Sequence, residues 1–179
     1  MKRVYLVRHC KAKGQEPEAQ LTDEGERQAE RLAEYLSDKN INYIVSSPFE
    51  RAMATIRPFS VKTSKKIHVD RRLSERVLSV ENLPDWMEKL KETFSDLDLK
   101  LPGGESSREA MSRGVEVIEE LFHRNEDHIV VVTHGNLMSL ILKYFDDRIG
   151  FEEWRGLSNP DIYELSQPDE SCAVQLKRL

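Results

Sequence analysis

Short runs of apolar and β-branched residues alternate along the chain with longer segments in which apolar side chains recur every three or four positions. The short runs are typical of buried β-strands, and the longer segments are typical of amphipathic helices. We therefore expect strands over residues 2–8, 42–46, 67–69 and 129–133. Helices are expected over residues 22–36, 50–59, 82–95, 106–122 and 137–144.

Polar residues predict where two of these helices begin. Thr22 precedes Asp23 and Glu24, which is the pattern of an N-cap followed by an acidic first turn. Ser106 and Glu109 have the spacing of a capping box, in which each side chain bonds the other residue's backbone N–H. The helix that starts at Ser106 should turn its apolar face inward, with Met111, Val115, Ile118, Leu121 and Phe122.

Two helix boundaries are set by weaker signals. Asn82 is expected to cap the helix over residues 82–95, whose apolar face would contain Leu83, Trp86, Met87, Leu90 and Phe94. Pro58 is expected to disturb the end of the helix over residues 50–59, because proline lacks the N–H that a helix interior needs.

The alternation of strands and helices predicts an α/β fold, a three-layer α/β/α sandwich with a mainly parallel central sheet. Residues 161–179 should form two strands joined by a turn at Gln167–Glu170, which would add a C-terminal antiparallel hairpin. The chain has no internal repeat or linker, so we expect one domain over residues 1–179. Residues 82–105 are expected to form a helix and loop inserted over the functional site.

Composition narrows the functional class. The 179 residues are 39% hydrophobic and 33% charged, with a formal net charge of −5, which is typical of a globular protein. Neither a basic footprint for nucleic acid nor an apolar run long enough for a membrane span is present, and no signal peptide is apparent. We expect a cytoplasmic protein with no nucleic-acid or membrane partner; its oligomeric state stays open. Cys10 and Cys172 are expected to be free thiols.

Cationic side chains follow three of the predicted strands. Arg8 and His9 lie at the end of residues 2–8, His134 follows residues 129–133, and Arg51 lies just beyond residues 42–46. Ligands of such folds bind beyond the carboxyl ends of the strands. A single histidine at a strand end is usually structural, but several desolvated cations need an anion to pair with. A phosphate group is that kind of anion, and the planar guanidinium of arginine matches it.

Several motifs, in this order, resemble those of the histidine phosphatase superfamily, which includes the cofactor-dependent phosphoglycerate mutases. They are LVRHC at 6–10, LTDEGERQA at 21–29, SSPFERAMAT at 46–55, LSE at 73–75, PGGES at 102–106 and VVTHGN at 131–136. An Arg-His pair alone is a weak signal. The ordered set, placed on α/β elements over most of the chain, is a strong one.

The resemblance implies a role for each matching residue. His9 would be the nucleophile, and Arg8, Arg51 and His134 would complete the phosphate pocket. Glu75 would protonate the leaving oxygen and then activate water. Its position alone favours an exposed carboxylate paired with Arg72 or Arg76, and the match to LSE favours the catalytic role. Glu105 is the alternative acid. The further substrate contacts are expected to come from Lys11, Gln15, Thr22, Gly135 and Asn136.

The sequence departs from the family pattern after the Arg-His pair, where the family usually has glycine and this chain has Cys10. A cysteine nucleophile of the protein tyrosine phosphatase type would need arginine six positions later, and that position is Glu16. Cys10 is therefore expected to be a buried structural thiol. Its position beside Arg8 and His9 leaves open a lowered pKa and sensitivity to oxidation. Lys11 and Ala12 also differ from the family, which puts the identity of the substrate in doubt.

We therefore expect a phosphoric monoester hydrolase that acts on a small phosphorylated metabolite through phosphohistidine and releases inorganic phosphate. No cofactor is expected, and no metal, because His, Cys and carboxylate residues lack convincing ligand spacing. The alternatives are mutase-type phosphoryl transfer, a phosphohistidine protein phosphatase and a non-catalytic phosphate-binding module. The chain lacks the extra segments that wall in the substrate of the mutases, which favours hydrolysis. The expected insertion over residues 82–105 disfavours a protein substrate, and the retained set of His9, Arg51, Glu75 and His134 disfavours a module without activity.

Overall fold

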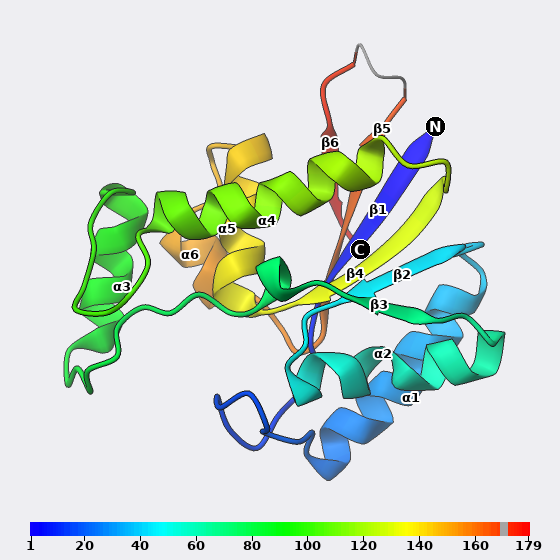
Figure 1. Ribbon diagram of the computed structural model, residues 1–179, viewed down its shortest axis with the longest axis horizontal. Coiled ribbons are helices and arrows are strands. Elements are labelled where there is room, and N and C mark those ends of the chain that lie inside the picture. Colours follow the sequence, from blue (N-terminus) through cyan, green and yellow to red (C-terminus); the bar gives the residue numbers. More distant parts are fainter. Residues whose placement is uncertain (169–171) are drawn as a thin grey trace.

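The computed structural model describes residues 1–168 and 172–179 and has a six-stranded sheet at its centre (Figure 1). The sheet has the order β3-β2-β4-β1-β5-β6. Its strands are β1 (Lys2–Arg8), β2 (Tyr43–Ser46), β3 (Ile67–Val69), β4 (His128–Thr133), β5 (Asp161–Gln167) and β6 (Gln175–Arg178).

The strands that were expected from the apolar runs form the parallel part of this sheet. β1 and β2 both pair with β4 in parallel, and β3 pairs in parallel with β2. β5 is antiparallel to β1, and β6 is antiparallel to β5 at the edge. The predicted α/β/α fold with a C-terminal antiparallel hairpin is confirmed. Asp169 and Glu170, which complete the predicted turn, lie outside the described residues.

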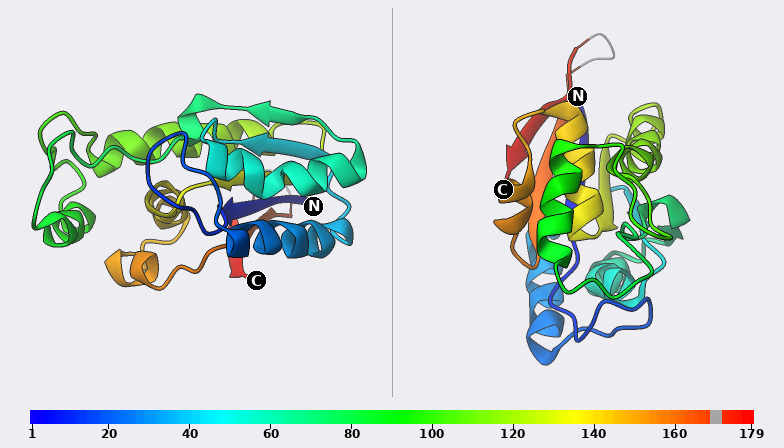
Figure 2. Two further views of the ribbon diagram at one scale, coloured as in Figure 1. Left: turned by 90° about the horizontal axis from the view of Figure 1, so that it is seen from below. Right: turned by 90° about the vertical axis from the view of Figure 1, so that its left-hand side faces the viewer.

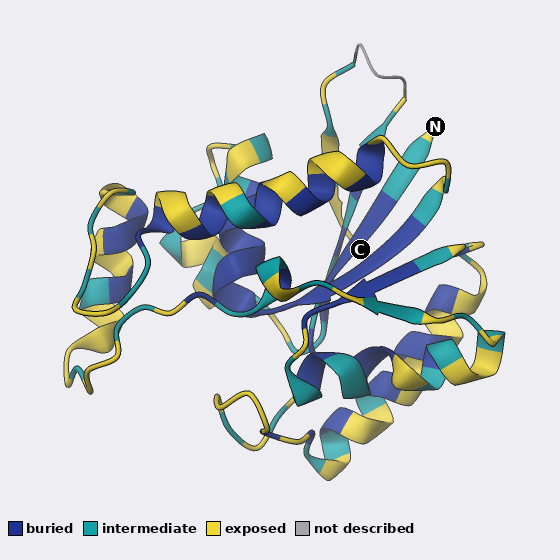
Figure 3. Ribbon diagram, in the orientation of Figure 1, coloured by how far each residue is buried: buried dark blue, intermediate teal, exposed yellow. Residues whose placement is uncertain are grey.

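Helices cover both faces of the sheet (Figures 1 and 2). On one face, α1 (Asp23–Ser37) and α2 (Glu50–Thr63) bury a cluster that includes Leu36 and Phe59. On the other face, α4 (Ser107–Phe122) and α5 (Gly135–Phe145) bury a larger cluster that includes Ile118. Figure 3 shows the dark blue strands between these layers. Burying apolar side chains on both faces is the main stabilisation of such a sandwich.

Two predicted helix caps are confirmed. The Thr22 side chain accepts a hydrogen bond from Gly25 N at the start of α1. Ser106 and Glu109 form the capping box at the start of α4. All five side chains predicted for the inner face of α4 are buried. These signals are local in sequence, which explains why they could be located without the fold.

Two predicted helix boundaries are wrong, the end of one helix and the start of another. α2 continues past Pro58 to Thr63, because apolar residues on either side of the proline, such as Ile56 and Phe59, stay buried against the sheet. The helix expected over residues 82–95 is α3, which begins only at Trp86. Leu83 precedes Pro84, and a residue in that position is disfavoured from helical backbone angles. Asp85, rather than Asn82, stands at the N-cap.

Two further helices, α3 (Trp86–Ser95) and α6 (Phe151–Arg155), pack against the apolar cluster of α4 and α5, away from α1 and α2 (Figure 2). In α3, Leu90 and Phe94 are buried, but Trp86 and Met87 are exposed, so only part of the expected apolar face packs inward. The short helix α6 was not expected. That residues 82–105 cover the functional site stays a prediction.

Two further expectations concern thiols and membranes. Cys10 and Cys172 are both free, as expected. Within the described part of the chain, no helix is long and apolar enough to cross a membrane.

Candidate active site

The residues predicted at the strand ends meet at one edge of the sheet. β1 and β4 are parallel, and Arg8 pairs with Thr133 in register, so His9 and His134 leave the sheet side by side. Their ring centroids are 5.2 Å apart. Arg51, near the start of α2, donates from Nε to His9 Nε2 at 3.1 Å. The structure therefore gathers both imidazoles and one guanidinium in a single buried site.

Hydrogen bonds fix the orientation and the tautomer of His9. Its Nδ1 lies 2.7 Å from the carbonyl oxygen of Cys10, which can only accept, so Nδ1 carries the proton. Nε2 consequently presents a lone pair toward Arg51 Nε. Burial, together with the neighbouring Arg51 and Arg8 cations, lowers the pKa of His9 to about 3, although the hydrogen bond to Cys10 O opposes this change. The imidazole is thus neutral near pH 7. The backbone of His9 is fixed as well, because the Asn159 side chain donates to His9 O at 2.8 Å.

Arg51 is one of the largest fully buried side chains, with 1% of its surface exposed. Its Nη1 donates to the carbonyl oxygens of Gln15 and Glu16 at 2.9 Å each, which ties the loop after β1 to α2. Burial lowers the pKa of Arg51, while Glu75 and Glu16 oppose that change. The Phe49 ring lies 5.1 Å from the guanidinium carbon. Arg51 is thereby held in one orientation beside His9.

His134 is held from two sides. Its Nε2 lies 2.7 Å from Ser47 Oγ, and the Phe49 ring packs edge-on at 4.9 Å between centroids. Burial holds the pKa of His134 well below its ordinary value, and the nearby His9 and Arg51 act in the same direction. His134 Nδ1 is buried and has no hydrogen-bond partner among the described residues.

Arg8 lies where the last residue of β1 meets the start of α5. Its Nη1 donates to the carbonyl oxygens of Leu157 and Ser158, at 3.0 and 3.3 Å. Burial lowers the pKa of Arg8, and Glu75 opposes that effect. Arg8 Nε is buried without a partner among the described residues. A Cβ at Gly135 would stand 3.0 Å from this nitrogen, so the close approach of the guanidinium to α5 favours glycine there.

Glu75 is partly buried and accepts three backbone hydrogen bonds. Its Oε1 accepts from Arg76 N at 2.8 Å and Leu137 N at 2.9 Å, and its Oε2 accepts from Asn136 N at 3.1 Å. The carboxylate thus sits at the first turn of α5, the helix for which His134 is the N-cap. The alternative of an exposed ion pair with Arg72 or Arg76 is wrong. Arg72 pairs with Asp70, Glu116 and Glu120. The buried guanidinium of Arg76 donates to Thr93, Ser107 and the carbonyl oxygen of Glu105.

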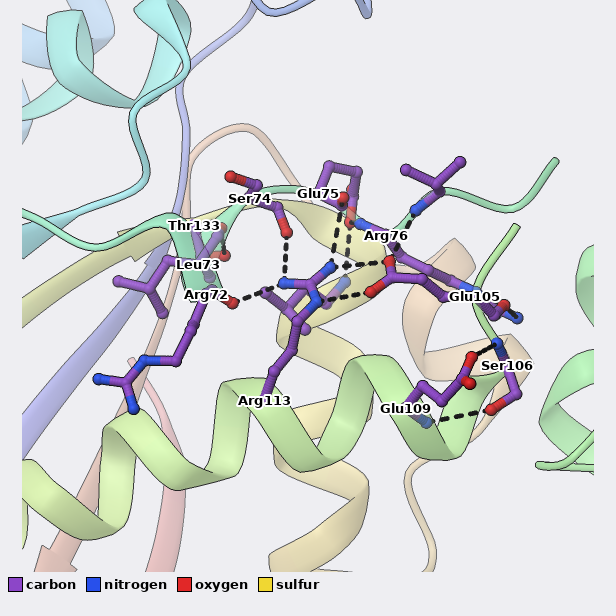
Figure 4. Close-up of polar contacts among 12 residues, drawn as sticks. Arg72, Leu73, Ser74, Glu75, Arg76, Glu105, Ser106, Glu109, Arg113 and Thr133 are labelled. Atoms are coloured by element: carbon purple, nitrogen blue, oxygen red, sulfur yellow. Dashed lines mark hydrogen bonds and ion pairs between the residues drawn. The ribbon is translucent and has the colours of Figure 1, made fainter. Parts of the chain in front are cut away.

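Glu105, the alternative acid, is engaged elsewhere. Its carboxylate accepts from Arg113 Nε at 2.7 Å and Nη2 at 2.9 Å, and from Val77 N at 3.0 Å (Figure 4). Burial acts to raise the pKa of Glu105, but these hydrogen bonds outweigh it and the pKa is lowered. A carboxylate that is kept ionised by a paired guanidinium is poorly suited to donate a proton.

The remaining predicted contacts differ in position. The side chains of Lys11 and Gln15 are exposed, and Gln15 takes part in the site through its carbonyl oxygen. Thr22 caps α1 and also donates to Lys11 O at 3.3 Å. Asn136 is buried, and its Oδ1 has no partner among the described residues. Their contact with a substrate stays a prediction.

Cys10 is the buried structural thiol that was expected. It is fully buried, and its backbone N donates to Thr55 Oγ1 at 2.8 Å. The lowered pKa that was considered from its charged neighbours is wrong: burial raises the pKa of the thiol to about 11, and the Thr55 bond opposes this only partly. Desolvation of the thiolate outweighs the attraction of the nearby cations.

Sequence reasoning missed the residues that hold the predicted ones in place. Ser47 lies within the SSPFERAMAT motif, so its proximity to Arg51 offered a signal. Asn159, by contrast, is 150 positions from His9, and Arg113 is 38 positions from Glu75. No local pattern marks either residue.

The chain belongs to the histidine phosphatase superfamily (branch 1), whose family model matches residues 4–178. Among curated proteins it is 29% identical, over 197 aligned positions, to "Putative phosphoserine phosphatase 2" of Hydrogenobacter thermophilus, with 100% of this chain and 97% of that protein covered. These findings confirm the predicted family and the predicted class of phosphoric monoester hydrolase.

Solved structures confirm the fold. A mycobacterial glucosyl-3-phosphoglycerate phosphatase has a TM-score of 0.79 at 22% identity, covering 99% of this chain and 96% of that one. A phosphoserine phosphatase mutant of Entamoeba histolytica, in complex with phosphoserine, has a TM-score of 0.75 at 20% identity, covering 98% and 95%.

Proposed function

We propose that the protein hydrolyses small phosphomonoesters without a metal ion, through a phosphohistidine intermediate on His9. The observation that carries this proposal is the state of the His9 ring. It is neutral, its Nδ1 proton is held by Cys10 O at 2.7 Å, and its Nε2 lone pair points at the guanidinium of Arg51. A neutral imidazole with one nitrogen anchored and a lone pair on the other can act as a nucleophile once Arg51 turns to the substrate.

In the first step, His9 Nε2 attacks the phosphorus atom and the ester P–O bond breaks. The departing oxygen takes a proton from Glu75, and the alcohol leaves. Glu75 accepts hydrogen bonds from Arg76 N and from Leu137 N at the start of α5, the helix that follows β4, so its carboxyl group lies at the same edge of the sheet as His9.

In the second step, water attacks the phosphorus atom of phosphohistidine and the P–N bond breaks. The Glu75 carboxylate now takes the proton from that water. The products are inorganic phosphate and neutral His9, and Glu75 is protonated again for the next cycle. Splitting one displacement into two easier ones is the general benefit of covalent catalysis.

Arg8, Arg51 and His134 would hold the phosphoryl oxygens. Two guanidiniums and an imidazole at one buried edge would supply the charge that phosphoryl transfer requires. Arg8 Nε and His134 Nδ1 are buried and unpaired in the described structure, and leaving such groups unpaired costs about 1–3 kcal/mol each. A bound phosphate would relieve that cost. Arg51 would turn its Nε hydrogen bond from His9 to the phosphate, which frees the nucleophile.

The leaving group separates the roles of His9 and Glu75. An alkyl alcohol leaves slowly without a proton, whereas nitrophenolate leaves readily. Phosphoserine, which occurs in the names of two of the similar proteins, is an ester of an alkyl alcohol. Glu75→Gln should therefore slow the phosphorylation burst with phosphoserine by about 10²–10⁴-fold. The burst with p-nitrophenyl phosphate should change far less. Rapid-quench measurements on both substrates give this comparison, because the burst precedes the water step.

The control for the Glu75 experiment is Glu116→Gln, which alters an exposed glutamate on α4. Both bursts should keep the wild-type rate in that variant. If Glu75→Gln slows the two bursts equally, Glu75 positions the site and does not supply the proton. Saturable binding of phosphoserine with no release of phosphate by the wild-type protein would instead support a binding module.

A further inference from the structure

The segment that carries Glu75 lies between the sheet and α4, outside the regular strands and helices. It follows a short 3₁₀ turn, η1 (Arg71–Leu73), and Thr133 of β4 holds it by donating from Oγ1 to Leu73 O at 2.7 Å. Backbone carbonyls in such a segment must find partners elsewhere when they are buried. The position of the Glu75 side chain therefore depends on what binds this backbone.

Arg113 of α4 binds three of these carbonyl oxygens. Its Nη1 donates to Arg72 O at 2.5 Å and to Ser74 O at 2.8 Å, and its Nη2 donates to Glu75 O at 3.4 Å. Figure 4 shows the guanidinium of Arg113 extending from α4 to the backbone segment that carries Glu75. Because the five guanidinium N–H donors lie in one rigid plane, they hold the carbonyls in a fixed arrangement.

Glu105 holds both Arg113 and the residues that follow Glu75. Its carboxylate accepts two hydrogen bonds from Arg113 and one from Val77 N. Its carbonyl oxygen accepts from Arg76 Nη2 at 2.9 Å. We call Arg113 and Glu105 the Arg113–Glu105 bracket, since together they fix the backbone on both sides of Glu75.

The bracket does not bond the carboxylate of Glu75, which instead accepts from Arg76 N and from the start of α5. Its influence on the carboxylate must therefore pass through the backbone. Catalytic groups need placement within about 0.5 Å, and a shift of about 1 Å can cost about 10²-fold in rate. The Arg113 and Glu105 side chains are 21% and 27% exposed, so water screens this ion pair only in part.

We propose that Arg113 and Glu105 are positioning residues for Glu75. They set where its carboxyl group stands relative to the ester oxygen, and they leave phosphate binding by the residues at the strand ends unchanged. This inference rests on the proposed function, because it assigns Glu75 the proton transfer. It concerns residues whose hydrogen bonds, among the described residues, reach neither His9 nor the carboxylate of Glu75.

The test is Arg113→Gln, assayed by rapid quench with phosphoserine and with p-nitrophenyl phosphate. Loss of the bracket should slow the phosphoserine burst by about 10–100-fold, because the proton donor is misplaced. The p-nitrophenyl phosphate burst should change by less than about threefold, because nitrophenolate needs no proton. The Kd for inorganic phosphate, measured by calorimetry, should stay at the wild-type value.

Glu105→Gln is the second variant, and it keeps the fold testable if Arg113→Gln does not fold. It retains the carbonyl contact with Arg76 but weakens the pairing with Arg113, so the same selective loss is expected at smaller size. The matched control is Arg108→Gln, on the same helix as Arg113. It breaks the exposed ion pair between Arg108 and Asp98 and should change neither burst. Adding Arg113→Gln to Glu75→Gln should not slow the phosphoserine burst further relative to the p-nitrophenyl phosphate burst, because Arg113 acts through Glu75.

Equal slowing of both bursts in folded Arg113→Gln and Glu105→Gln would overturn the positioning role, and so would a weakened Kd for phosphate. If Glu75→Gln keeps its selective effect while the bracket variants have none, this inference alone fails. If Glu75→Gln itself shows no selectivity, the assigned proton transfer fails, and the bracket's role fails with it.

Discussion

The depressed pKa of His9 makes a prediction about stability that needs no substrate. Burial lowers the pKa from its ordinary value of 6.5 to about 3. Between these values the unfolded chain binds a proton at His9 and the folded protein does not. The sign follows from this difference: stability contributed by neutral His9 is complete above pH 6.5 and is lost as pH falls toward 3.

The size of the effect follows from the pH range. Each unit below 6.5 costs about 1.4 kcal/mol, so a change from pH 7 to pH 5 should cost about 2 kcal/mol through His9 alone. His9→Asn removes the titrating ring and keeps a side-chain N–H that can reach Cys10 O. The variant should therefore lose about 2 kcal/mol less free energy of unfolding than wild type between these two pH values.

Urea unfolding of both proteins at pH 7 and pH 5, followed by circular dichroism, measures this difference. Phosphate buffers must be avoided, because an anion bound to the folded state would add its own stabilisation. His123→Asn is the control, since it removes an exposed imidazole at the end of α4. Equal losses of unfolding free energy by wild type and His9→Asn over this pH range would show that the pKa of His9 is not depressed in the folded protein.

Three further predictions concern catalysis. Arg51→Ala should lower kcat/KM for p-nitrophenyl phosphate about 10³-fold or more, as with other arginines that clamp a phosphoryl group, and steady-state kinetics on the folded variant test this. Cys10→Ser should keep substantial turnover, and the native thiol, whose pKa burial raises to about 11, should resist alkylation by iodoacetamide until the protein unfolds. Turnover should survive dialysis against EDTA; loss of activity that one added metal restores would contradict the proposed chemistry.

Periodicity located most of the scaffold because it is a local property of the sequence. The apolar runs gave four strands, and the parallel pairing of β1, β2 and β4 explains why residues at their carboxyl ends meet. Helix ends were less predictable. Pro58 lies inside α2 because the burial of its apolar neighbours stabilises the helix on both sides of the proline. α3 begins only at Trp86 because Pro84 disfavours helical backbone angles at the residue before it.

The candidate site was predictable only as far as its motifs reach. His9, Arg51 and His134 come together as expected. Their supports come from remote parts of the chain: Asn159 fixes the backbone of His9, and Arg113 fixes the segment of Glu75. Such contacts depend on the tertiary fold, so a single sequence carries no signal for them. The pKa of Cys10 shows the same limit, because charged neighbours are visible in the sequence and burial is not.

His9 is proposed to carry the phosphoryl group, and trapping the phosphohistidine would decide whether it does. Wild-type protein would be mixed with p-nitrophenyl phosphate, quenched in alkali because phosphohistidine is acid-labile, and digested for tandem mass spectrometry. We expect a phosphoryl group on His9 that is present during turnover and absent in His9→Asn. A phosphoryl group on Cys10 or His134, or continued turnover by folded His9→Asn, would contradict it.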